Sequence, residues 1–172
     1  LQKLSSLNVS NNAIVSFSNL SSLNQLQELN LANNNLNKVP SEIINFISLK
    51  SLDLSNNIIT DFSSLSNLIN LEWLSLENNS LQNIPNQVSN LQKLIHLNLG
   101  RNKIIGGTSV LGTLVHLQQI WLNHNKLSGN IPQDLLALPN LMCLSLQSNE
   151  LEGTIPNNIP QICNISNNRF SK

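Results

Sequence analysis

A single spacing of leucines runs through the whole chain and constrains its fold more than any other feature. The clearest copy is 71–81, LEWLSLENNSL, which follows the pattern L-x-x-L-x-L-x-x-N-x-L. Successive copies start 22 to 24 residues apart, at Leu4, Leu26, Leu49, Leu71, Leu94, Leu117 and Leu141. A unit of this length cannot bury its apolar edge alone and does so only against its two neighbours. The spacing therefore predicts a solenoid with one elongated core.

One asparagine stands at an equivalent place in every unit, including a degenerate eighth unit anchored by Cys163, Ile165 and Phe170. A buried amide is tolerated only when it is hydrogen-bonded. We therefore expect these asparagines to form a ladder that bonds backbone groups of neighbouring turns. The predicted ladder consists of Asn12, Asn34, Asn57, Asn79, Asn102, Asn125, Asn149 and Asn168.

The leucine pattern and the asparagine column resemble those of leucine-rich repeat proteins, and the resemblance covers the chain from end to end. It implies an α/β solenoid, in which a parallel β-sheet lines the concave side of an arc and 3₁₀-helical, short helical or extended segments form the convex side. Strands of about three to five residues are expected, for instance Trp73–Glu77. Apolar residues spaced by three indicate 3₁₀ turns on the convex side. They include Phe17 with Leu20 and Phe62 with Leu65.

The later units change type. Segments 127–132, LSGNIP, and 151–156, LEGTIP, resemble the L-x-G-x-I-P subclass known from plant receptor ectodomains and polygalacturonase inhibitors. The resemblance implies a second small sheet beside the first, and it favours an extracellular or cell-surface location, although the compartment stays open. We expect residues 1–172 to form one domain of about eight repeats without end caps. This domain is expected to be a segment of a longer chain, with its ends covered by neighbouring domains or subunits.

Charge argues against two classes of partner. The formal net charge is zero and only 10% of the residues are charged. Such a chain has no basic stripe to neutralise phosphates and no polybasic segment to hold a membrane surface. No apolar run approaches the roughly 20 residues that cross a bilayer. We therefore expect neither a nucleic-acid partner nor direct membrane insertion.

The two cysteines, Cys143 and Cys163, lie in adjacent turns. In the repeat frame, Cys163 takes the place of a buried leucine, whereas Cys143 falls one position earlier, on the opposite face of its strand. Their Cβ atoms should point apart, which is incompatible with a disulfide. The sequence therefore predicts two free thiols, which favour a reducing compartment.

Large side chains gather on the predicted concave face of units four to six. The exposed strand positions elsewhere are small, neutral and rich in amides, whereas Trp73, His96 and Trp121 stand among them. Tryptophan commonly anchors interfaces. We predict a site for a protein or peptide partner at these three residues, with orientation set by Asp53, Glu77, Arg101 and His124. The alternative is that the indoles only cover the sheet and that the histidines are simply solvated.

Catalysis and metal binding are not expected. Ser75, His96 and Asp53 fall on one face, but about 10 Å would separate the carboxylate from the imidazole it has to orient. Neither a nucleophile turn nor a glycine-rich oxyanion loop accompanies Ser75. His96 and His124 lack further ligands at metal spacing. We expect no catalytic residues, no metal and no cofactor.

These observations favour a non-enzymatic protein–protein interaction module, receptor- or adaptor-like, that recognises its partner on the concave face. Fold-level analogy supplies much of this expectation. One alternative is a structural scaffold segment buried in a larger assembly, which the missing caps and low charge suggest. Another is binding of an ordered polar surface such as ice or polysaccharide, which the asparagine and serine columns suggest.

Overall fold

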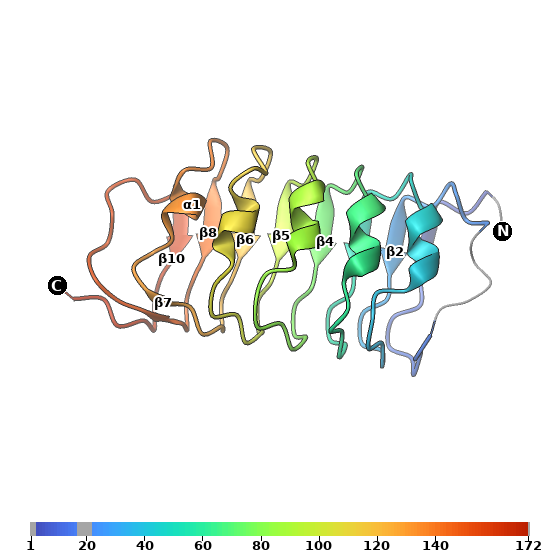
Figure 1. Ribbon diagram of the computed structural model, residues 1–172, viewed down its shortest axis with the longest axis horizontal. Coiled ribbons are helices and arrows are strands. Elements are labelled where there is room, and N and C mark those ends of the chain that lie inside the picture. The colour runs from blue at the N-terminus through green and yellow to red at the C-terminus, as the bar shows by residue number, and fades with distance from the viewer. Residues whose placement is uncertain (1–2, 17–21, 172) are drawn as a thin grey trace.

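A computed structural model describes residues 3–16 and 22–171 as a gently curved solenoid, with the two ends of the chain at opposite ends of the arc (Figure 1). Eight three-residue strands pair in parallel and in chain order, in register from one turn to the next. They are β1 (Ser6–Asn8), β2 (Glu28–Asn30), β3 (Ser51–Asp53), β4 (Trp73–Ser75), β5 (His96–Asn98), β6 (Gln119–Trp121), β8 (Cys143–Ser145) and β10 (Ile162–Asn164).

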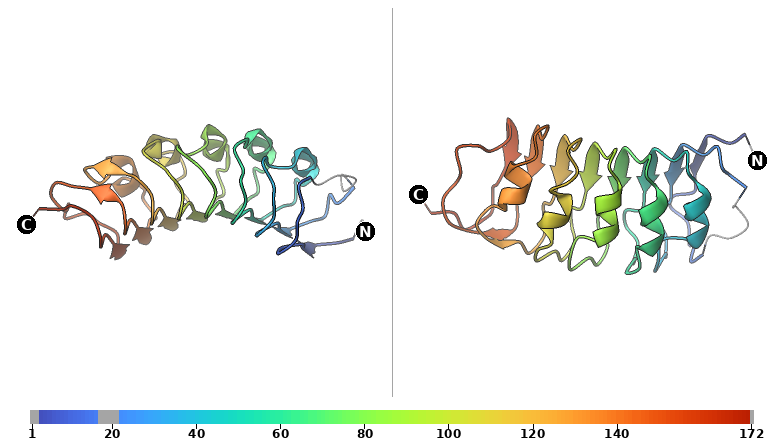
Figure 2. Two further views of the ribbon diagram at one scale, coloured as in Figure 1. Left: turned by 90° about the horizontal axis from the view of Figure 1, so that it is seen from below. Right: turned by 45° about the horizontal axis from the view of Figure 1, so that its top comes forward.

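The sheet lines the concave side and short helices cover the convex side, as expected (Figure 2). The helices are η1 (Ser41–Asn45), η2 (Ser63–Asn67), η3 (Asn86–Asn90), η4 (Thr108–Leu111) and α1 (Gln133–Leu136). The 3₁₀ turn expected around Phe62 and Leu65 is confirmed as η2, whose Leu65 is buried. The turn expected at Phe17 and Leu20 lies outside the described residues.

The two L-x-G-x-I-P units form the second small sheet that their resemblance implies. Strand β7 (Ser128–Gly129) pairs in parallel with β9 (Glu150–Leu151). Gly129 and Gly153 have φ values of +75° and +84°, a region that side chains with a Cβ rarely adopt, which explains the glycine in each motif. The later turns are therefore hydrogen-bonded to each other along two edges of the arc.

The recurring leucines form one continuous core. In turn four, Leu71, Leu74 and Leu76 have no exposed surface and Leu81 is 6% exposed. In the described part of the chain, contacts between strands and between helices join successive turns, so each turn packs against the turns before and after it. The core is open at both ends, where Leu4 and Leu7 in the first turn and Ile165 and Phe170 in the last are only partly buried.

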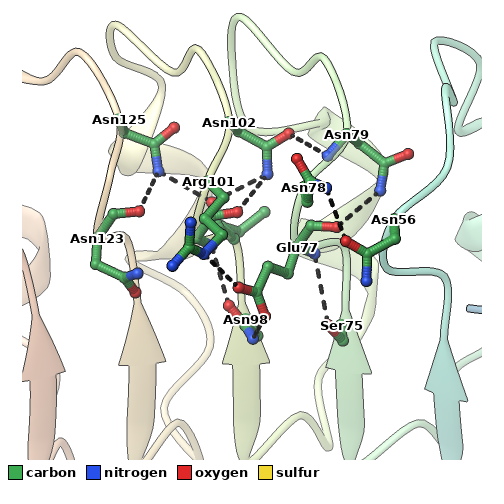
Figure 3. Close-up of polar contacts among 12 residues, drawn as sticks. Asn56, Ser75, Glu77, Asn78, Asn79, Asn98, Arg101, Asn102, Asn123 and Asn125 are labelled. Carbon is green, nitrogen blue, oxygen red and sulfur yellow. Dashed lines mark hydrogen bonds and ion pairs between the residues drawn. The ribbon is translucent and has the colours of Figure 1, made fainter. Parts of the chain in front are cut away.

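The asparagine column runs along the strand-exit edge and joins successive turns (Figure 3). The Asn79 Oδ1 accepts the Ile59 backbone N–H at 3.0 Å, and its Nδ2 donates to the Leu54 carbonyl at 3.1 Å, both in turn three. The same Nδ2 donates to the Leu76 carbonyl of its own turn at 3.2 Å. The six inner asparagines are buried, whereas Asn168 is partly buried and Asn12 is exposed at the first turn.

Both cysteines are free thiols, as predicted. Cys163 occupies the central position of β10, opposite Leu144 of β8, and packs against the core, whereas Cys143 is opposite Ile162. Burial raises the pKa of the Cys163 thiol, and the nearby Cys143 adds to this shift. A thiol with a raised pKa is less often in the reactive thiolate form.

Candidate functional site

The parallel register places the predicted aromatic anchors on strands β4 to β6, with Trp73 and His96 side by side and Trp121 further along β6. Trp73 is directly opposite His96 on the neighbouring strand, and Trp121 is opposite Asn98. Trp73, His96 and Trp121 are all partly exposed. None of them belongs to the buried core, so large apolar and imidazole groups form part of the open face of the sheet; we call these three residues the aromatic patch.

Two of the predicted charged residues neutralise each other at the edge of this patch (Figure 3). The Arg101 Nε lies 3.3 Å from the Glu77 Oε1, and the Asn98 Nδ2 donates to the Glu77 Oε2 at 2.9 Å. An ion pair this exposed contributes about 0–1 kcal/mol to stability. The ion pair therefore contributes more to the arrangement of side chains at the edge of the aromatic patch than to the stability of the fold.

A column of oxygen-bearing side chains ends most of the strands, and its role was not evident from the sequence. In five turns the third strand residue accepts the backbone N–H two residues further on, at 2.9–3.1 Å. These residues are Asn8, Asn30, Asp53, Asn98 and Asn164. Asp53, which we predicted to contact a partner, thus also has a backbone role, as such Asx turns do.

Strand β4 is shorter than the expected Trp73–Glu77, since every strand of the main sheet has three residues. It ends at Ser75, whose Oγ accepts the Glu77 backbone N–H at 3.4 Å. Turns six and seven depart from the pattern of acceptors: Trp121 occupies the equivalent position on β6, and the Ser145 Oγ on β8 donates to the Gln147 Oε1 instead. An indole offers no oxygen acceptor, and the Asn123 N–H has no acceptor within residues 3–16 and 22–171. The aromatic patch therefore includes a residue that forgoes a local hydrogen bond.

A second column, immediately before the ladder asparagine, adopts the left-handed conformation in all eight turns. Its φ values lie between +50° and +58°. Five of the eight residues are asparagine, which tolerates this conformation better than most side chains. The exceptions are Arg101, His124 and Ser148, in three consecutive turns. The excess of asparagine thus has a backbone explanation, and it does not by itself indicate a surface for ice or polysaccharide.

A shallow hollow of about 380 Å³ adjoins the aromatic patch on the side of the first turns. Trp73 borders it, and Glu28, Ser51 and Asp53 are among its lining residues. Glu28 and Ser51 were not predicted as site residues. They are separated from Trp73 by one or two whole repeats in sequence, and only the strand register places them together.

A larger hollow, of about 650 Å³, lies between turns three and four on the strand-exit edge. In most turns the residue after the ladder asparagine donates its N–H to the preceding turn, for example Lys103 to the Leu81 carbonyl at 2.8 Å. The equivalent Ser80 N–H has no such backbone bond among the described residues. The Ser63 backbone and side chain lower the pKa of Asp61 in this hollow by hydrogen bonding.

The geometry offers little to a hydrolytic or metal-dependent reaction. Asp53 and His96 are on β3 and β5, with β4 between them. Across residues 3–16 and 22–171, no group of three His, Cys, Asp or Glu side chains could hold a metal ion. In the same part of the chain, no helix is long and apolar enough to cross a membrane.

The repeat geometry agrees with the comparison with known families. The family model described as a leucine-rich repeat region matches residues 3–167. The chain belongs to the leucine-rich repeat family. No curated protein matches this leucine-rich repeat chain by sequence.

Solved structures similar to this leucine-rich repeat domain come from bacteria and plants. An internalin of Listeria monocytogenes is 35% identical with a TM-score of 0.77, over 87% of this chain and 43% of that one. A leucine-rich repeat protein of Leptospira interrogans is 32% identical with a TM-score of 0.89, over 98% and 44%. The plant peptide hormone receptor RGFR1, in complex with RGF2, is 30% identical with a TM-score of 0.71, over 96% and 27%. The chain spans less than half of each of these relatives.

Proposed function

We propose that this leucine-rich repeat domain is a non-enzymatic interaction module that binds a protein or peptide on its concave face, over β4 to β6. The observation that carries the proposal is that Trp121 and Arg101 occupy positions where most other turns have asparagine or aspartate, which suit the backbone there, and that His124 takes the next corner. Natural proteins accept such local conflicts mainly at functional sites. Trp121 belongs to the aromatic patch and Arg101 lies at its edge, whereas another altered corner, Ser148, lies outside it. The aromatic patch is the surface best suited to anchor a partner.

The relatives support this class of function and favour a setting for it. One solved relative is a plant peptide hormone receptor in complex with RGF2, and others are internalins. By analogy with these proteins, we propose a protein or peptide ligand and an extracellular or cell-surface location. The analogy is at the level of the fold, so the specific contacts have to come from the residues of this chain.

The decisive variant is Trp121→Asn, which replaces the anchor by the residue that the same position has in turns one, two, five and eight. A new Asx hydrogen bond to the Asn123 N–H should offset the lost contacts of the indole, so stability should change by less than about 1 kcal/mol. Binding of peptides selected from a random display library should weaken by at least about tenfold. Urea unfolding and fluorescence titration measure the two quantities.

Ile47→Ala is the matched control, since Ile47 is an apolar residue of the convex side with 61% of its surface exposed. It should leave both stability and peptide binding unchanged. The proposal fails if the selected peptides bind the Trp73→Ala and Trp121→Asn variants as tightly as they bind the native protein.

The scaffold alternative rests on a separate observation, the incomplete burial of both ends of the core. Val9 and Ile14 in the first turn and Cys163 and Phe170 in the last are only partly buried. Such edges suit stacking by a neighbouring repeat, domain or subunit. If Phe170→Asp abolishes assembly with a binding protein while Trp121→Asn leaves it intact, the main contact is at the end of the arc.

A further inference from the structure

The hollow beside Trp73 is bordered on one side by the indole ring, and the residue at its centre is the small Ser51. Ser51 on β3 is directly opposite Glu28 on β2 and directly opposite Trp73 on β4. The short serine side chain thus leaves room between a carboxylate on one side and an indole on the other. Asp53, two residues further along β3, lies on the same face of the sheet and also lines the hollow.

Neither carboxylate has a cationic partner among the residues that the structure describes. The Glu28 Oε2 accepts the Ser6 hydroxyl at 3.0 Å, and the Asp53 Oδ1 accepts the Ser55 backbone N–H at 2.9 Å. The three ion pairs found in residues 3–16 and 22–171 involve Glu72, Glu77 and Glu150 instead. The concave positions of β1 to β3 contain no lysine or arginine. A neutral chain therefore has two uncompensated negative charges in this hollow.

We propose that the hollow binds a basic side chain, lysine or arginine, of the protein or peptide partner; this inference rests on the proposed function and names the chemistry of its ligand. A cation over the Trp73 ring is attracted to the indole face, and it would stand between the carboxylates of Glu28 and Asp53. Charge complementarity selects this occupant over an acidic peptide or a neutral saccharide. The exposed carboxylates favour orientation and selection of the partner more than tight binding.

The test uses a small probe and the two tryptophans as reporters. The chain has only Trp73 and Trp121, so a nitrogen-15 labelled sample gives two indole N–H signals, which the Trp121→Asn variant assigns. N-acetyl-arginine amide is titrated into the protein, and N-acetyl-citrulline amide, which is similar in shape but uncharged, serves as the comparison. The Trp73 signal should shift with arginine, with an affinity at least about fivefold higher than with citrulline and a response that falls as salt is added.

The double variant Glu28→Gln, Asp53→Asn removes both charges but keeps an oxygen acceptor at each position, and asparagine is the residue at the Asp53 position in several other turns. It should weaken the arginine response by at least about threefold. Glu152→Gln, an exposed acid outside the hollow, should not change it. Equal responses to arginine and citrulline, an unaffected double variant, or a shift confined to Trp121 would each overturn the inference.

The two proposals fail in different ways. Selected peptides could require Trp121 for binding and yet contain no basic residue whose contribution depends on Glu28 and Asp53. In that case the proposed binding site is retained and the proposal of a basic ligand is rejected. If arginine binds the hollow in a charge-dependent way while no selected peptide requires the aromatic patch, the proposed function falls.

Discussion

At the scale of single residues, the left-handed residue before each ladder asparagine, which we call the corner residue, shows how the backbone limits the surface chemistry of this domain. All eight corner residues have φ near +54°, and asparagine occupies five of these positions. A left-handed residue with an ordinary side chain costs roughly 1–2 kcal/mol, and asparagine costs less because its short polar side chain bonds locally. Ser148 therefore adopts this conformation at a higher cost than Asn167 does in the next turn.

Ser148→Asn should raise the free energy of unfolding by about 0.5–1 kcal/mol, because it restores the preferred corner residue. Urea unfolding followed by circular dichroism measures the change. Ser109→Asn, in the exposed part of η4 where φ is not positive, is the control and should change stability by less than about 0.5 kcal/mol. Equal effects of the two substitutions would show that corner conformation is not the cause.

A ladder asparagine has a much larger effect on stability than an exposed one. Asn79→Ala leaves the buried Ile59 N–H without its acceptor and removes one of the two amide donors to the Leu54 carbonyl, so we expect a loss of about 1–3 kcal/mol. Asn45→Ala, on the exposed side of η1, should be close to neutral in the same thermal and urea unfolding experiments. A loss below about 0.5 kcal/mol at Asn79 would contradict the role assigned to the ladder.

At the scale of elements, each turn is a strand, a corner and a convex segment that packs on two neighbours. Leu76→Ala deletes a side chain with no exposed surface and should cost about 2–5 kcal/mol. Hydrogen exchange should accelerate most in β3, β4 and β5 and least in β10, since coupling passes through nearest neighbours. Ile69→Ala, 58% exposed on the convex side, is the control. A uniform loss of protection along the arc would contradict this picture.

The spacing of the leucines was enough to predict the strands and the convex segments. The candidate site could not be predicted in this way, because it depends on which residues face each other on neighbouring strands. The predicted arc and its two faces are correct because inward leucines recur at one spacing. Strand β4 is two residues shorter than expected, because the strand ends after three residues in every turn and the chain then reaches a left-handed residue, Asn78 in this turn. The hollow escaped prediction because it depends on the small Ser51 standing between Glu28 and Trp73 in neighbouring strands.

At the scale of the whole molecule, stability should grow with the number of turns, because each added turn contributes an interface. Units start at Leu4, Leu49 and Leu94, with 45 residues from each to the next. Inserting a second copy of residues 49–93 before Leu94 should extend the arc by about 10 Å and raise the melting temperature. X-ray scattering and calorimetry measure the two changes.

The same segment inserted after Leu76 interrupts a turn and should lower the melting temperature. An in-phase insertion that unfolds would contradict the nearest-neighbour account.

The left-handed corners also bear on how such a domain can diversify. A corner side chain lies outside the leucine core, so exchanging it affects its own backbone conformation and its contacts with the neighbouring turn, such as the bond from Asn78 to Asn56. At roughly 1 kcal/mol for each departure from asparagine, novel corners in all eight turns would cost about 8 kcal/mol, which is comparable with the whole stability of an ordinary domain (about 5–15 kcal/mol). With three corners already changed, each further exchange at a corner would narrow the margin that remains for keeping the arc folded.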